Sequence, residues 1–148
     1  MYKLLRIPKF VTKIDKSFIS KYFSLNSNFK ITIQYSYILN CGKIVPHPDA
    51  GDKILTLLLF FPYLNNKEEL NYGTTFWNSN YKNYKDKHIK SIHEQNEFKM
   101  KSKILYEAQF LKNNLFGFIK NDFSWHSVEP INVQKNYIRK SININIYY

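Results

Sequence analysis

Short runs of β-branched, aromatic and aliphatic residues, separated by turn-forming residues, fill the chain from residue 29 to its end. Several of these runs alternate apolar and polar positions with a period of two, the pattern of a strand with one buried face. The run at 54–64 is apolar throughout and too short for a buried helix, so it predicts a strand buried on both faces. Strands are therefore expected at residues 31–39, 54–64, 72–77, 104–111, 115–120, 124–128 and 139–147.

Turn residues between these runs set the expected architecture. Lys112, Asn113 and Asn114 predict a hairpin between residues 104–111 and 115–120. Seven or eight short strands in a chain of 148 residues predict one all-β domain over residues 1–148. A sandwich or barrel of the jelly-roll kind is the expected form.

Two segments depart from the strand pattern. Residues 15–22 predict a short N-terminal helix, with Asp15 as the N-cap and Phe18 and Tyr22 on one face. Residues 78–103 are rich in Lys and Asn and poor in aliphatic residues, so we expect a polar, solvated insertion or a lid there. The lysines of this segment could steer an acidic peptide or a nucleic acid toward the protein, or could simply solvate a loop.

Composition narrows the function classes. Hydrophobic residues make up 44% of the chain and aromatic residues 18%, which excludes a disordered basic tail, because such tails lack the side chains that build a core. The formal net charge is +11, but 20 of the 22 basic residues are Lys, and this bias is typical of AT-rich coding sequences. The charge alone therefore does not establish nucleic-acid binding.

The sequence also predicts a cytoplasmic protein. Cys41 is the only cysteine, which excludes an intrachain disulfide framework and a CxxC motif. Lys3, Arg6 and Pro8 interrupt the apolar start of the chain, so no signal peptide is expected. The longest apolar run is far shorter than the ~20 residues of a membrane span, so no membrane contact is expected.

Two histidines stand in chemically informative positions. His47 and Asp49 are two residues apart, which in extended backbone places both on one face of a sheet. His126 lies on a separate expected strand. Two imidazoles and one carboxylate, with open positions opposite them, form the facial triad of non-haem Fe(II) oxygenases. Taken alone, the His47-Pro48-Asp49 motif is better explained as a surface histidine beside an aspartate in a turn.

The last expected strand adds a candidate anion site. Arg139, Ser141, Asn143 and Asn145 share one face of residues 139–147, and isoleucines occupy most of the other. A buried arginine needs a bidentate anion for its donors, and a dicarboxylate cosubstrate would supply one. The alternative is an edge strand on which a solvated Arg-Lys pair and the asparagines face water.

Together these pieces resemble the Fe(II)/2-oxoglutarate-dependent dioxygenase superfamily, whose members fold as a double-stranded β-helix. The set HxD, His and RxS occurs in the order that the family shows. The matching stretches are residues 46–61, 73–76, 112–118, 124–130 and 139–147.

The resemblance implies an activity and a role for each residue. His47, Asp49 and His126 would bind Fe(II), and Arg139 with Ser141 would hold the distal carboxylate of 2-oxoglutarate. The enzyme would use O2 to hydroxylate a C–H bond of its substrate, releasing succinate and CO2. A small molecule or a peptide is the expected substrate, and nucleic acid stays open as a partner without being indicated.

Further residues near the motif have weaker expectations. One of Tyr35 and Tyr37 should face inward and could hydrogen-bond 2-oxoglutarate, although packing explains either at least as well. Lys53 resembles a lysine found in many members of the family, but we expect a solvated loop lysine. Trp125, beside His126, should point to the opposite face and pack in the core.

Two rival functions remain open. A non-catalytic basic β-sandwich could bind single-stranded nucleic acid or an acidic peptide through aromatic residues and lysines. A catalytically degenerate member of the family could keep the fold and the metal without turnover. The sequence does not indicate the oligomeric state.

Overall fold

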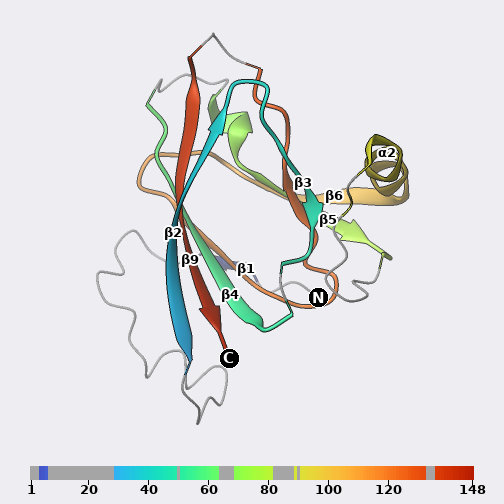
Figure 1. The fold of residues 1–148 in the computed structure, drawn as a ribbon, viewed down its shortest axis with the longest axis horizontal. Coiled ribbons are helices and arrows are strands. Elements are labelled where there is room, and N and C mark those ends of the chain that lie inside the picture. The colour runs from blue at the N-terminus through green and yellow to red at the C-terminus, as the bar shows by residue number, and fades with distance from the viewer. Residues whose placement is uncertain are drawn as a thin grey trace.

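The structure, a computed structural model, describes residues 4–6, 29–49, 51–63, 69–81, 89, 91–132 and 136–148. The helix expected at residues 15–22 lies outside them. The described residues form two antiparallel sheets, as the all-β prediction requires (Figure 1). The five-stranded sheet has the order β1-β7-β4-β9-β2, and the four-stranded sheet has the order β3-β8-β5-β6.

Most strands lie close to the runs that the sequence singles out, whereas those at Leu4–Arg6 and Ile44–His47 are not among the expected strands. Their bounds are β1 Leu4–Arg6, β2 Lys30–Leu39, β3 Ile44–His47, β4 Lys53–Phe60, β5 Thr74–Ser79, β6 Ser102–Ala108, β7 Leu115–Ile119, β8 His126–Val128 and β9 Ile138–Tyr147. A 3-10 helix covers Glu69–Tyr72, and helix α2 covers Ile92–Lys101. No helix among the described residues has the length and apolar character needed to cross a membrane.

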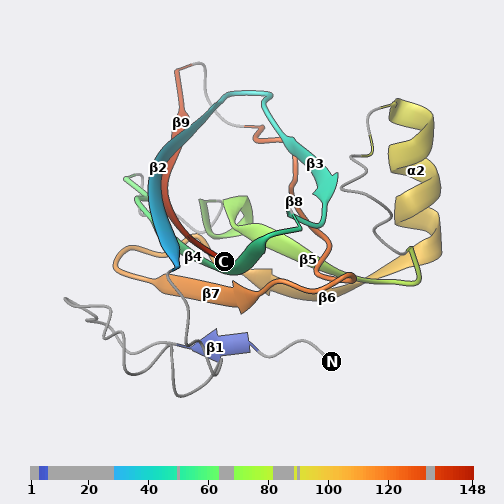
Figure 2. The same ribbon diagram turned by 60° about the horizontal axis from the view of Figure 1, so that its bottom comes forward.

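From β2 to β9 the strands pair in a nested order, in which the first pairs with the last, the second with the second last, and so on. β2 pairs with β9, β3 with β8, β4 with β7, and β5 with β6. The β4·β9 and β5·β8 pairings join these pairs into the two sheets. In Figure 2, β2 and β9 lie across the molecule from β3 and β8, with helix α2 outside the latter pair. This order brings together segments that lie far apart in the sequence.

The hairpin expected between residues 104–111 and 115–120 is wrong. β6 pairs with β5 in one sheet, whereas β7 pairs with β4 and β1 in the other. The turn at Lys112 and Asn113 does form, and Asn113 has the left-handed φ of 58° that such a turn favours. Ala108 and Phe110, just before it, are buried, so the chain crosses between the sheets instead of folding back on itself.

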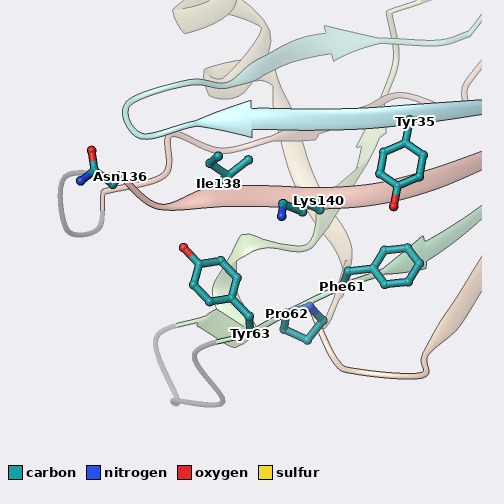
Figure 3. A pocket seen from close by; sticks show the side chains of 7 residues that line it. All are labelled: Tyr35, Phe61, Pro62, Tyr63, Asn136, Ile138 and Lys140. Atoms are coloured by element: carbon teal, nitrogen blue, oxygen red, sulfur yellow. The ribbon is translucent and has the colours of Figure 1, made fainter.

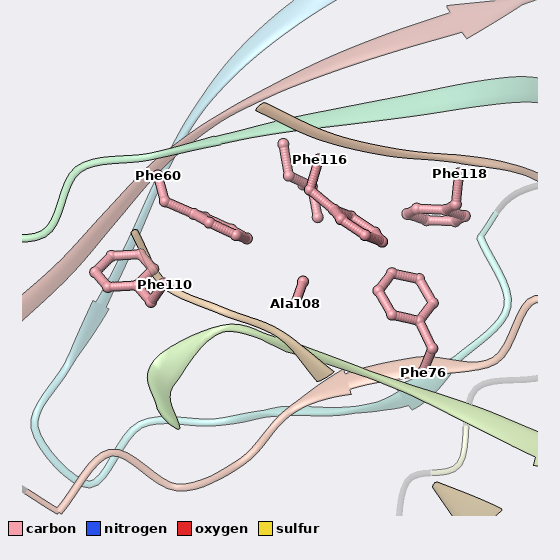
Figure 4. Close-up of a cluster of buried hydrophobic side chains, with 7 residues drawn as sticks. Phe60, Phe76, Ala108, Phe110, Phe116 and Phe118 are labelled. Atoms are coloured by element: carbon pink, nitrogen blue, oxygen red, sulfur yellow. The ribbon is translucent and has the colours of Figure 1, made fainter. Parts of the chain in front are cut away.

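An aromatic cluster fills the space between the sheets (Figure 4). The phenylalanines come from both sheets, and each buried ring contributes roughly 2–3 kcal/mol through the hydrophobic effect. The close approach of Gly73 to β6 keeps this packing tight, since a Cβ at Gly73 would lie 1.4 Å from the Ala108 carbonyl oxygen. The members of the cluster are Leu58, Phe60, Phe76, Ala108, Phe110, Phe116 and Phe118.

The segment at residues 78–103 is more structured than the solvated insertion expected. Helix α2 begins with a capping box, in which Ser91 and Glu94 each bond the other's backbone N–H. Phe98 is fully buried and packs with Trp77 and Trp125. Phe98 therefore docks the helix, whereas the other apolar residues of α2, Ile92 and Met100, are exposed.

We predict that Phe98→Ala lowers the free energy of unfolding by about 3 kcal/mol, because it leaves a cavity between α2 and the two tryptophans. Met100→Ala on the same helix is the matched control, since Met100 is 80% exposed. Urea unfolding followed by tryptophan fluorescence measures both variants. Equal destabilisation by the two substitutions would contradict the docking of α2.

Candidate metal centre

Three residues that the sequence singles out meet at one point between β3 and β8. His47 ends β3, His126 begins β8, and the two are direct cross-strand partners, with ring centroids 4.2 Å apart. Asp49 follows β3 by two residues. One ligand atom from each of the three side chains lies within 4.8 Å of the others.

Local backbone features explain how these side chains converge. The pairing of β3 with β8 shifts between Ile44 and His47, where β3 holds one more residue than its partner. Such a bulge re-aims the side chains beyond it, and Pro46, which has no N–H to donate, lies within it. Asp49 has a left-handed φ of 53°, a conformation that aspartate tolerates better than most residues. The carboxylate thus reaches the histidines through a turn, and not through the strand alternation on which the prediction relied.

Backbone carbonyls fix the orientation of both imidazoles. His47 Nδ1 lies 2.9 Å from the Val45 carbonyl oxygen, and His126 Nδ1 lies 2.9 Å from the Ser124 carbonyl oxygen. A carbonyl only accepts, so each Nδ1 carries the proton and each Nε2 carries the lone pair when the ring is neutral. Both Nε2 atoms lie 3.9 Å from Asp49 Oδ1.

The carboxylate of Asp49 is held at both oxygens. Lys53 Nζ donates to Oδ1 over 2.7 Å, and the Thr56 hydroxyl donates to Oδ2 over 2.9 Å. The side chain of Lys53 is only 11% exposed, so the expectation of a solvated loop lysine is wrong. Lys53 turns inward because it begins β4 directly beside the turn that carries Asp49.

Burial and neighbouring charges set the protonation of the group. Burial acts to raise the pKa of the Asp49 carboxyl, but the positive charges of Lys53 and of protonated His126 and His47 outweigh it, so this pKa lies below its ordinary value. Burial lowers the pKa of the His126 imidazole, against the opposing effect of Asp49. An ionised carboxylate and a neutral imidazole are the forms that bind a metal ion.

The donor set therefore fits a divalent transition metal. Two imidazole nitrogens and one carboxylate oxygen converge from one side, and carbonyl groups hold both rings from behind, as is usual for histidine ligands. Aromatic rings pack on His126, with the ring centroids of Phe118 and Phe76 at 4.7 Å and 5.8 Å. The site thus borders the aromatic core.

Arg139 is buried in the same interior, at the start of β9. Its Nε donates to the Tyr72 carbonyl oxygen, and its guanidinium carbon lies 5.3 Å and 5.0 Å from the ring centroids of Phe60 and Phe110. Burial lowers the pKa of Arg139 to about 10, so the side chain stays charged at neutral pH. No Asp or Glu among the described residues forms an ion pair with it.

The inward face of β9 carries polar side chains from Arg139 to Asn145. Ser141 lies 3.5 Å from an Arg139 nitrogen and 3.3 Å from the Asn143 amide oxygen. At the far end, the amide oxygen of Asn145 lies 3.3 Å from the Thr56 hydroxyl that binds Asp49. The alternative of a solvated arginine on an edge strand is excluded, because β9 lies between β4 and β2 and Arg139 is buried.

Neither tyrosine of β2 faces the interior. Tyr35 and Tyr37 are 71% and 69% exposed. Positions two apart share one face of a strand, so the expectation that one of the two faces inward is wrong. Gln34 is the neighbour that reaches Asn145. Tyr35 instead lines a shallow outer hollow of about 400 Å³, together with Tyr63 and Lys140 (Figure 3).

Sequence reasoning missed the supports of Asp49. Thr56 is the one polar residue inside the apolar run of β4, and this isolation was a usable signal for a buried hydrogen bond. Asn145 was placed on the correct face without a role. Trp125 is confirmed as a core residue, since it is buried and packs with Trp77 and Phe98.

Comparisons with known proteins do not identify a relative. No family model matches the chain, and no curated protein matches it significantly.

We predict that Thr56→Val weakens the binding of Mn(II) about tenfold, since the hydrogen bond that orients Asp49 is lost. Thr75→Val replaces another buried threonine of the sheets, one without a bond to Asp49, and serves as the control. Isothermal titration calorimetry measures both. Unchanged affinity in Thr56→Val would show that Asp49 does not depend on this contact.

Proposed function

We propose that this protein is an Fe(II)- and 2-oxoglutarate-dependent dioxygenase that hydroxylates a C–H bond of a substrate still to be identified. The observation that carries this proposal is the cluster of His47, Asp49 and His126, with both Nε2 atoms directed at one carboxylate oxygen. Two neutral imidazoles and a carboxylate leave the remaining coordination positions of an iron open. A structural zinc site, by contrast, is usually closed by four protein ligands.

The strand pairing supports the same proposal. The nested pairs β2·β9, β3·β8, β4·β7 and β5·β6 are what a hairpin-like chain produces when it folds over into two facing sheets. This is the order expected of a jelly roll or double-stranded β-helix. In such a fold, the pairing of β3 with β8 is what makes the two histidines neighbours.

Arg139 supports 2-oxoglutarate as the cosubstrate. A guanidinium buried between two aromatic rings, with no carboxylate partner among the described residues, is matched to an anion that arrives from outside. Ser141 adds a hydroxyl beside it. Arg139 would bind one carboxylate of 2-oxoglutarate and so fix the orientation of this cosubstrate.

The positions of these residues indicate a separate role for each of them. When bound, Fe(II) with 2-oxoglutarate and O2 supplies the oxidising power for hydroxylation, with release of succinate and CO2. The two histidines and Asp49 would hold the metal, while Thr56 and the Val45 and Ser124 carbonyls fix the geometry of these ligands. Phe76 and Phe118 exclude water from the side of His126.

Thermal unfolding without oxygen tests the proposal. We predict that Mn(II), a redox-inert substitute for Fe(II), together with 2-oxoglutarate raises the Tm of the wild type by several degrees but leaves His126→Ala unchanged. His93→Ala, an exposed histidine on α2, is the control and should respond like the wild type. An unchanged Tm in the wild type would contradict the binding of Mn(II) and 2-oxoglutarate and would favour the non-catalytic β-sandwich.

Succinate formation from 2-oxoglutarate and Fe(II) in air then separates an active enzyme from a degenerate one. A protein that shows the thermal shift but forms no succinate above the His126→Ala background would keep the site without the activity.

We predict a separate signature for Arg139. Arg139→Lys should weaken 2-oxoglutarate binding about tenfold or more, because lysine lacks the planar fork that grips a carboxylate. The Mn(II) affinity should stay unchanged, because Arg139 does not touch the triad. Lys140→Ala, its outward-facing neighbour, is the control. Calorimetry with each ligand measures both, and equal losses for metal and 2-oxoglutarate would assign Arg139 a purely structural role.

A further inference from the structure

We propose that Lys53 is a built-in competitor cation, which neutralises the triad when no metal is bound and keeps the binding of a divalent metal weak and reversible. This inference rests on the proposed metal site and adds a regulatory residue to it. The ammonium of Lys53 lies 2.7 Å from Asp49 Oδ1. That oxygen is the same one that both histidine Nε2 atoms approach to 3.9 Å.

The charges around Asp49 have opposite consequences with and without a metal. Asp49 is 8% exposed, and a carboxylate buried to this extent destabilises the folded chain unless a positive charge accompanies it. Lys53 supplies that charge in the metal-free protein. Once a divalent ion binds the same carboxylate, Lys53 becomes a like charge at close range in a poorly solvated site. One residue thus stabilises the empty site and opposes its filling.

The surroundings give the ammonium a second resting place. Lys53 is the first residue of β4 and lies opposite Tyr147 on β9. Its Nζ is 5.9 Å from the centroid of the Tyr147 ring, within the range of a cation–π contact. The side chain can therefore release Asp49 and stay close to the ring.

A neutral substitution at Lys53 should separate the two effects. We expect Lys53→Met to lower the Tm of the metal-free protein and to tighten the Kd for Mn(II) about tenfold or more, since the like charge is gone. Lys53→Arg keeps the charge and should bind Mn(II) as the wild type does. Lys99→Met is the matched control, because it removes a lysine–carboxylate pair, with Glu129, away from the triad.

Calorimetry with Mn(II) alone and thermal unfolding of the metal-free proteins provide the two readouts. If Lys53→Met does not fold, Lys53→Gln keeps a hydrogen bond to Asp49 without charge and should tighten binding in the same direction. If the wild type binds Mn(II) and the neutral variants bind it with equal or lower affinity, the proposed role of Lys53 is overturned, whereas the metal site still stands. Binding by a neutral variant but not by the wild type would support the role strongly. Absence of binding in every variant would overturn the metal site and this inference with it.

Discussion

The buried charge of Asp49 is the constraint on which this part of the molecule depends. A carboxylate that is largely removed from water must be matched by donors and positive charge, and the surrounding residues supply both. Lys53 and Thr56 donate to one oxygen each, and the amide oxygen of Asn145 is a second acceptor beside the Thr56 hydroxyl. These partners come from β4 and β9, whereas the histidines come from β3 and β8. The interactions of this carboxylate therefore link the two sheets. The geometry of the site depends on how the sheets pack at this end.

The nested pairing makes this convergence possible. His47 and His126 are far apart in the chain, yet they are cross-strand partners because β3 and β8 form the second of four nested pairs. Thr56 and Asn145 are likewise direct partners between β4 and β9. Such pairings close long loops before they gain contacts, so the fold is rich in non-local contacts and is expected to form slowly. In exchange, short strands carry side chains from distant segments into one small volume.

The sequence predicted the strands and the polar residues of the site better than it predicted their connections. Alternation placed Arg139 and Ser141 on one face, and the structure shows that this face is buried. The turn chemistry at Asn113 was recognised correctly, but a turn does not determine whether the chain returns to the same sheet. Tertiary packing of Phe110 made that choice. Lys53 was missed because its role depends on the left-handed turn at Asp49, which sequence spacing does not reveal.

The interior of the sheets is built from two unlike surfaces. β4, β5 and β7 contribute phenylalanines, whereas β9 turns Arg139, Ser141 and Asn145 inward and leaves several of its isoleucines only partly buried on the opposite face. A strand placed for stability alone would have the reverse orientation, because burying a guanidinium costs more than burying an isoleucine gains. Proteins break this rule mainly at functional sites. On β9, the informative charge is thus that of Arg139, which lies inside, between two aromatic rings.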